Sequence, residues 1–213
     1  MTTYVLVHGA WHGGWCWKKT ASLLRDAGAE VFAPTLTGMG ERAHLNGRID
    51  PSEITLDVHI QDIVHMMCYE GLEEVVLVGH AYAGMVITGV AEVCPERIAH
   101  MVYVNGVIPA DGESMADQLV PVRGEEFAAW VRDQIENGDG FLPAPASVEE
   151  VGRRWGITDP EDLAWVGANV TPQPAAAMAS PVHIANPKAA QIPKNFVGGG
   201  ESGFDTVAER ARQ

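Results

Sequence analysis

One short segment near the middle of the chain has the residue types and spacing of a catalytic turn. Its sequence, Leu77-Val78-Gly79-His80-Ala81-Tyr82-Ala83-Gly84, fits the frame of the G-x-S-x-G nucleophile elbow, with alanine at the third and fifth positions. That pattern places one residue on a strained turn between a strand and a helix, where small neighbours let other backbone pass close by. The methyl group of Ala81 cannot attack a carbonyl carbon or carry a covalent intermediate. The segment therefore predicts a catalytic turn that lacks its usual attacking atom.

Other patterns that could carry chemistry are incomplete. Gly38-Met39-Gly40-Glu41-Arg42-Ala43 formally fits the G-x-G-x-x-A pattern, but it follows a polar loop and opens no clear helix, which disfavours dinucleotide binding. The glycine run at 198–200 lacks the Lys-Ser/Thr pair of a phosphate-binding loop, and no H-E-x-x-H spacing indicates zinc. Cys16, Cys68 and Cys94 are far apart in the sequence, so we expect three buried thiols rather than disulfides or a metal site. No cofactor and no metal are predicted.

The composition predicts a packed domain that avoids polyanions. A chain of 213 residues with 46% hydrophobic residues can bury a core as one domain with an inserted lid. Its formal net charge of −14 opposes binding to nucleic acid and to anionic lipid, because like charges repel. The longest apolar stretch, 75–91, is interrupted by small and polar residues, so no membrane span is expected. Without a basic leader before the strand-like run at 4–7, and with few cysteines, we expect a cytoplasmic protein.

The elements that would position this turn alternate between strands and helices. Such alternation predicts an α/β protein with a mainly parallel sheet flanked by helices, and its working crevice lies at the carboxyl ends of the strands. The predicted strands are Tyr4–Val7, Glu30–Ala33, Glu74–Val78, His100–Val104 and Phe196–Val197. The predicted helices are Trp15–Ala27, Leu56–Tyr69, Tyr82–Val93, Gly124–Glu136, Pro160–Asn169 and Asp205–Arg212.

The composition of the sequence changes after the fourth predicted strand. Prolines accumulate from Ile108 to about Gln191, and the helical segments become short. This predicts an inserted helical lid at residues 108–191, within a core formed by residues 1–107 and 192–213.

Several of these stretches together resemble one family. The stretches His8–Trp15, Ala33–Arg42 and Val76–His80 are similar to the α/β-hydrolase superfamily, within the branch of plant methyl-ester esterases, hydroxynitrile lyases and their bacterial relatives. Val102–Val104, Ile108–Ser114 and the lid stretch that ends at Thr171-Pro172 add to the resemblance, which covers nearly the whole chain. The resemblance implies the α/β-hydrolase fold with an inserted helical lid.

The resemblance also implies a set of catalytic positions. Family members use a serine, a histidine and a carboxylate, and the serine belongs at Ala81. The backbone N–H groups of Ala10 and Tyr82 would form the oxyanion hole, and backbone donors tolerate side-chain changes. The candidate acid positions are Asn105, which is an amide, and Glu201. The family histidine follows the helix that residues 205–212 resemble, and this sequence has no histidine after position 183.

The resemblance places an apolar pocket around these positions. Trp11 and His12 near the oxyanion loop, and Trp130, Trp165 and Met178 in the lid, are the candidate lining residues, although ordinary core packing is the alternative. The expected ligand is a small, apolar, carbonyl-containing or aromatic molecule. Hydroxynitrile lyases of the branch usually carry threonine where this chain has Gly9, which favours the esterase side.

Three functional hypotheses follow. The first is a carboxylesterase-like protein that is inactive or nearly so in this form, because position 81 is alanine and the triad is incomplete. Ala83, where the family usually has glycine, mildly favours natural drift over deliberate replacement. The alternative is a non-hydrolytic small-molecule-binding protein, or a lyase or cyclase that uses only the pocket and the oxyanion donors. A structural role as a partner in a homodimer is a third option.

Overall fold

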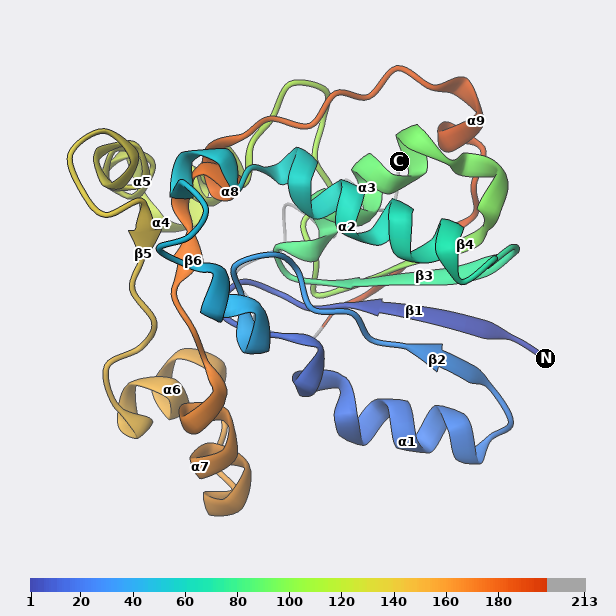
Figure 1. Cartoon of the computed structure of the whole chain (residues 1–213), viewed down its shortest axis with the longest axis horizontal. Helices are drawn as coiled ribbons and strands as arrows, with labels where there is room; N and C mark the ends of the chain where they lie inside the picture. Colours follow the sequence, from blue (N-terminus) through green and yellow to red (C-terminus); the bar gives the residue numbers. More distant parts are fainter. Residues whose placement is uncertain (199–213) are drawn as a thin grey trace.

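The computed structural model describes residues 1–198, and its centre is a parallel β-sheet with helices on both faces (Figure 1). The strand order is β2-β1-β3-β4-β7, and every neighbouring pair is parallel, so the predicted parallel sheet is confirmed. The strands are β1 Thr3–Val7, β2 Glu30–Phe32, β3 Val75–His80, β4 Ile98–Val104 and β7 Lys194–Val197. The order reverses between β1 and β3, which is where ligands bind in sheets of this kind.

The alternation of side chains along each strand divides the core into two layers. In β1, Val5 and Val7 point into the larger cluster with α2 and α3, whereas Leu6 points into the smaller cluster beside α1. Figure 1 shows the same arrangement, with α1 on one face of the sheet and α2 and α3 on the other. Because both faces are covered, the strands read as continuous apolar runs in the sequence.

The helices that flank the sheet lie close to their predicted positions. The apolar spacing of α2 gives one buried face that includes Ile60, Ile63 and Met67. The first helix begins as a 3₁₀ turn, Gly14–Trp17, before the α-helix proper. These helices are α1 Lys18–Asp26, α2 Leu56–Tyr69 and α3 Ala83–Val93, and the connecting 3₁₀ helices are Gly40–Leu45, Pro51–Glu53 and Pro95–Arg97.

The segment between β4 and β7 contains more regular structure than the sequence predicts. Two of its helices, α5 and α7, match the predicted ones, while α4, α6, α8, α9 and a small antiparallel pair, β5 with β6, were not predicted. The proline-rich composition hid α4, which accommodates Pro121 within its length. The elements are α4 Met115–Arg123, α5 Glu125–Glu136, β5 Phe141–Leu142, α6 Val148–Trp155, α7 Pro160–Asn169, β6 Gln173–Pro174, α8 Ala175–Ala179 and α9 Pro187–Ala190.

This inserted segment packs in two different ways. Its last part joins the main core, where Met178, Val182 and Ile192 are buried with the side chains of the sheet. The α6–α7 hairpin instead contacts the start of the chain, where Trp165 packs edge-on against Trp15 with 5.1 Å between ring centroids. An ion pair between Lys19 and Asp162 accompanies that contact.

The prediction for the cysteines is partly wrong. Cys94 is buried and Cys16 is half-buried, but Cys68 is exposed. Cys68 follows the buried Met67 in α2, so the helical rotation turns its side chain toward solvent. Within residues 1–198, no helix has the length and apolar character that a bilayer crossing requires.

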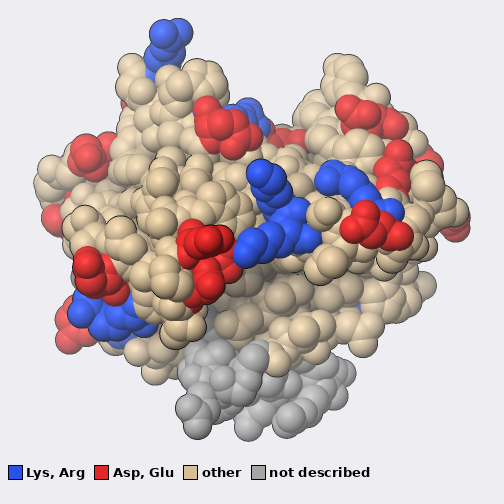
Figure 2. All heavy atoms as spheres, turned by 90° about the horizontal axis from the view of Figure 1, so that it is seen from below, with Lys and Arg blue, Asp and Glu red and all other residues tan. Residues whose placement is uncertain are grey.

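Charges of both signs are mixed on the surface. On the face shown in Figure 2, Lys and Arg side chains lie among Asp and Glu side chains, with one group of basic residues near the middle. The described part of this face therefore shows side chains of both signs rather than a patch of one sign.

A very close backbone approach at Gly84 gives the first prediction. A Cβ atom on Gly84 of α3 would lie 2.0 Å from the carbonyl oxygen of Val107, and backbone cannot move aside cheaply. We expect Gly84→Ala to lower the free energy of unfolding by at least ~3 kcal/mol in urea denaturation, the upper part of the overpacking range. Gly167→Ala in α7 is the control, since its Cβ would meet only ordinary contacts at 3.4 Å or more and alanine favours a helix. Equal effects of the two substitutions would contradict the described contact between α3 and residue 107.

Candidate functional site

Residue 81 occupies a tight turn between β3 and α3. Ala81 has a φ angle of +51°, a left-handed conformation that side chains other than glycine seldom adopt. Its carbonyl oxygen accepts hydrogen bonds from the N–H groups of Gly84, at 3.1 Å, and Val107, at 3.2 Å. A Cβ atom on Gly79 would lie 2.8 Å from the carbonyl oxygen of Ala83. The glycines at 79 and 84 therefore allow the turn to form, as the elbow pattern requires.

The loop after β1 lies beside this turn. Val7 pairs with Gly79 in the sheet, so the two segments leave neighbouring strands together. A Cβ atom on Gly9 would lie 2.9 Å from the Nδ1 atom of His80 and 3.2 Å from the Cβ atom of Ala81. A side chain at residue 9 would therefore require the His80 ring and the turn to shift. Gly9 thus brings the backbone of residue 10 close to residue 81.

Two backbone N–H groups at this place are unpaired. Within residues 1–198, neither the N–H of Ala10 nor that of Tyr82 has a hydrogen-bond acceptor. Both residues are buried, and an unpaired donor in such a position costs free energy unless a ligand or water satisfies it. Chemically, two such donors can stabilise a carbonyl oxygen or an oxyanion.

Two histidines brace the loop after β1. The Nδ1 atom of His8 lies 2.9 Å from the carbonyl oxygen of Gly9, and the N–H of Leu36 donates to its Nε2 atom at 3.0 Å. His12 is buried, with its Nδ1 atom 2.7 Å from the carbonyl oxygen of Ala10. Its ring is stacked on Trp15 and contacts Trp155 edge-on. His12 therefore serves first as part of a packed ring cluster.

Trp11 ties the loop after β1 to the inserted segment. Its φ angle is +64°, and its Nε1 atom donates to the carbonyl oxygen of Pro143 at 3.0 Å. The backbone N–H of Trp11 donates to the Oε1 atom of Gln173 at 3.4 Å, and its carbonyl oxygen accepts from the N–H of Thr171 at 3.0 Å. The guanidinium of Arg154 lies 4.6 Å from the centre of the Trp11 ring. The sequence did not single out Gln173, although it is fully buried and polar.

Of the three lid residues predicted to line a pocket, Met178 belongs to the main core and Trp130 packs against that core, whereas Trp165 lies in α7. Trp165 packs against Trp15, and Trp130 packs against Phe127 with 5.8 Å between ring centroids. Met178 is fully buried in α8 within the main core. A pocket lined by these three side chains therefore stays a prediction.

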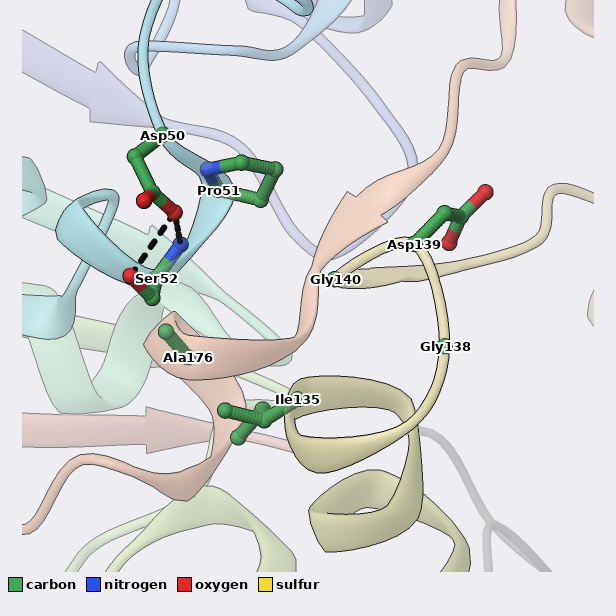
Figure 3. Close-up of a pocket in the computed structure, with 8 residues that line it drawn as sticks. All are labelled: Asp50, Pro51, Ser52, Ile135, Gly138, Asp139, Gly140 and Ala176. Carbon is green, nitrogen blue, oxygen red and sulfur yellow. Dashed lines mark hydrogen bonds between the residues drawn. The ribbon is translucent and has the colours of Figure 1, made fainter.

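Two cavities formed by residues 1–198 lie away from residue 81. One of about 150 Å³ is formed where Asp50 and the start of the 3₁₀ helix Pro51–Glu53 face the loop after α5, with Ile135 and Ala176 below it (Figure 3). The other, of about 360 Å³, is lined mainly by apolar surface, including Phe141, Pro143 and Pro172. Neither cavity includes residue 81 or any predicted lining residue. A cavity over the turn therefore stays a prediction.

Of the two candidate acid positions, the structure describes Asn105. Asn105 follows β4 with a φ angle of +44°, and its N–H donates to the carbonyl oxygen of Val197 at 2.7 Å. Its side-chain oxygen is buried without a hydrogen-bond partner among the described residues. Since His80 pairs with Val104 in the sheet, Asn105 leaves the sheet beside Ala81. Glu201 and the predicted helix at 205–212 lie outside the described residues.

The histidines around the turn are buried in their neutral form. Burial lowers the pKa of His8 to about 3 and the pKa values of His59 and His80 to about 4, from 6.5 in an exposed setting. The folded protein resists protonation of these rings, whereas the unfolded chain takes up protons below pH 6.5. The stability that these rings contribute is therefore present above pH 6.5 and is lost as the pH falls toward 4.

This predicts an acid-sensitive fold. We expect the free energy of unfolding, measured with urea, to fall between pH 7 and pH 5 with a slope of at least ~1.4 kcal/mol per pH unit, equivalent to one proton. His59→Gln should reduce that slope, while His65→Gln should leave it unchanged because His65 is exposed on the same helix. A constant stability from pH 7 to pH 5 would show that these rings are not buried as described.

The sequence is similar to known proteins of one family. Residues 4–212 match the sequence profile of the "Alpha/beta hydrolase family". A carbendazim hydrolyzing esterase from Nocardioides sp. (strain SG-4G) is 39% identical over 191 residues, which cover 87% of this chain and 74% of the relative. Putative methylesterase 13 of Arabidopsis thaliana is 29% identical over 209 residues, 91% of this chain. The chain spans only 44% of that plant relative's length.

A solved structure agrees in fold. The methylesterase MES16 from Arabidopsis superposes with a TM-score of 0.74 at 21% identity, over 99% of this chain and 86% of that structure. The shared feature is the parallel sheet with its flanking helices, which places residue 81 on the turn after β3.

Proposed function

This chain belongs to the alpha/beta hydrolase family, and from that premise we propose that it binds a small carbonyl-containing molecule without hydrolysing it through residue 81. The observation that carries the proposal is the turn itself. Ala81 lies in the left-handed conformation beside two unpaired backbone donors, yet its side chain is a methyl group. The site therefore retains what would stabilise a carbonyl oxygen and lacks what would attack the carbonyl carbon.

The missing hydroxyl sets the expected activity. In a serine hydrolase the serine forms the covalent acyl intermediate, and without it only the donors and substrate binding remain. These leave a small fraction of the catalytic rate. We therefore propose an esterase-like protein that is inactive, or nearly so, as an ester hydrolase in this form.

The ligand class follows from the donors and from the relatives. Two backbone N–H groups, one from the loop after β1 and one from the turn after β3, favour an oxygen with concentrated negative charge, such as that of an ester or a ketone. The relatives are named as a carbendazim hydrolyzing esterase and as methylesterases. We propose methyl esters of small apolar acids, and ketones of similar size, as the ligands of this chain.

The inserted segment has a part in this proposal. The loop that carries Ala10 is held by Pro143, Thr171 and Gln173 through Trp11. These residues come from the stretch 108–191, so we propose that this stretch acts as a lid that both covers the turn and fixes one of its donors. A ligand that seats under the lid would therefore also tighten the contacts of Trp11.

The central test separates binding from hydrolysis. We expect methyl phenylacetate to bind the wild-type protein saturably in an NMR titration, while methanol release stays at the rate of buffer alone, because no nucleophile is present at residue 81. Release well above buffer would contradict the non-hydrolytic role, and a flat titration would contradict the ligand class.

A matched pair of variants tests whether residue 81 is the place of binding. Ala81→Gly keeps the left-handed turn and both donors, so the dissociation constant should stay within about twofold. Ala81→Leu fills the space above the turn and should weaken binding by more than tenfold, about 1.4 kcal/mol. Thermal unfolding of both variants shows whether the fold is retained, and equal binding by the two would place the ligand elsewhere.

A further inference from the structure

A buried hydrogen-bond network lies beneath one of the two proposed donors. The hydroxyl group of Tyr82 lies 2.9 Å from the Nδ1 atom of His59, and the Nε2 atom of His59 lies 3.0 Å from the carbonyl oxygen of Thr37. A carbonyl oxygen can only accept, so Nε2 carries the proton and donates to Thr37. Nδ1 is then the acceptor for the hydroxyl of Tyr82.

The end of this network at Thr37 is held by several hydrogen bonds. The N–H and the hydroxyl group of Thr37 both donate to the carboxylate of Asp62, at 2.6 and 2.9 Å. Arg42 donates to the same carboxylate at 3.0 Å and to the carbonyl oxygen of Thr35 at 2.9 Å. Asp62 lies one turn after His59 on α2, so two side chains of this helix hydrogen-bond to Thr37 in the loop after β2.

The other end of the network is Tyr82, the residue that follows Ala81. Tyr82 is fully buried, and its backbone N–H is one of the two unpaired donors. Its ring meets the ring of His59 edge-on at 5.8 Å, and its hydroxyl group also lies 3.5 Å from the carbonyl oxygen of Ala177 in α8. The side chain is thus fixed at its tip, so movement of the tip would rotate the backbone at 82.

We propose that His59 is a positioning residue, which sets the direction of the backbone N–H of Tyr82 through the hydrogen bond to the Tyr82 hydroxyl. This inference rests on the proposed function, because it assigns a role to His59 in binding a carbonyl oxygen. It extends that function by adding a residue that never touches the ligand.

The charge state of His59 suits this role. Its pKa is lowered to about 4, mainly by burial and to a smaller extent by the guanidinium of Arg42, while the contact with Thr37 and the carboxylate of Asp62 act in the opposite direction. The titratable groups that face the ring are therefore Asp62, Arg42 and Tyr82. At neutral pH the ring is uncharged and keeps Nδ1 free to accept.

The chain offers a matched set of variants. Tyr82→Phe removes only the hydroxyl group, and His59→Leu removes the acceptor. His59→Gln keeps an amide that can accept from Tyr82 and donate to Thr37. Tyr103→Phe is the control, since Tyr103 is also buried and its hydroxyl group makes one side-chain hydrogen bond, to Thr88 at 2.9 Å.

The binding experiment uses acetophenone labelled with ¹³C at the carbonyl carbon. In the wild-type protein the donors should shift the carbonyl stretch of bound acetophenone to lower frequency. We expect Tyr82→Phe and His59→Leu to reduce that shift and to weaken binding about fivefold, whereas His59→Gln and Tyr103→Phe stay within about twofold of wild type. A purely structural role would lower the stability of Tyr82→Phe and Tyr103→Phe alike and leave the carbonyl stretch unchanged.

A ligand-free measurement separates this inference from the proposed function. The amide of residue 82 should exchange its hydrogen faster, and its ¹H–¹⁵N signal should move, in Tyr82→Phe and His59→Leu but not in Tyr103→Phe. If acetophenone fails to bind the wild type while these amide changes appear, the ligand class is wrong and the positioning role stands. If the amide and the carbonyl stretch behave alike in all variants, the positioning role is overturned.

Discussion

The close approach of three backbone segments around residue 81 is the constraint on which the site depends. The loop after β1, the turn after β3 and the segment after β4 meet where a side chain on Gly9 or Gly84 would collide with a neighbour. The sheet produces this meeting because β1, β3 and β4 are adjacent and parallel. The two donors of the site are backbone groups, and their position follows from this meeting of backbone segments.

The two donors are braced from different directions. Ala10 is held through Trp11 by residues of the inserted segment, and Tyr82 is held through its hydroxyl group by α2. Ala177 of α8 also lies near the tip of Tyr82. The inserted segment is therefore built into the support of the site as well as placed near it. Such bracing from several elements is what keeps unpaired donors from relaxing toward other acceptors.

Much of the fold could be predicted from the sequence, because strands covered on both faces and amphipathic helices such as α2 leave strong patterns. The helices α4 and α6 were missed because prolines and short length obscure periodicity. Yet each begins with a capping signal, Ser114 with Asp117 and Ser147 with Glu150, that could have revealed it. The turn at Ala81 was readable, but the positions of Trp130, Trp165 and Met178 depend on tertiary packing that no local pattern encodes.

The left-handed conformation of Ala81 has a consequence for how this sequence can change over generations. A conformation that costs an alanine roughly 1–2 kcal/mol is kept although no hydroxyl group uses it. Alanine and serine codons differ by a single base in the first position. A single point mutation would therefore place a hydroxyl group on a turn that already has the required conformation. Selection could act on that hydroxyl group without any other change in the backbone around it.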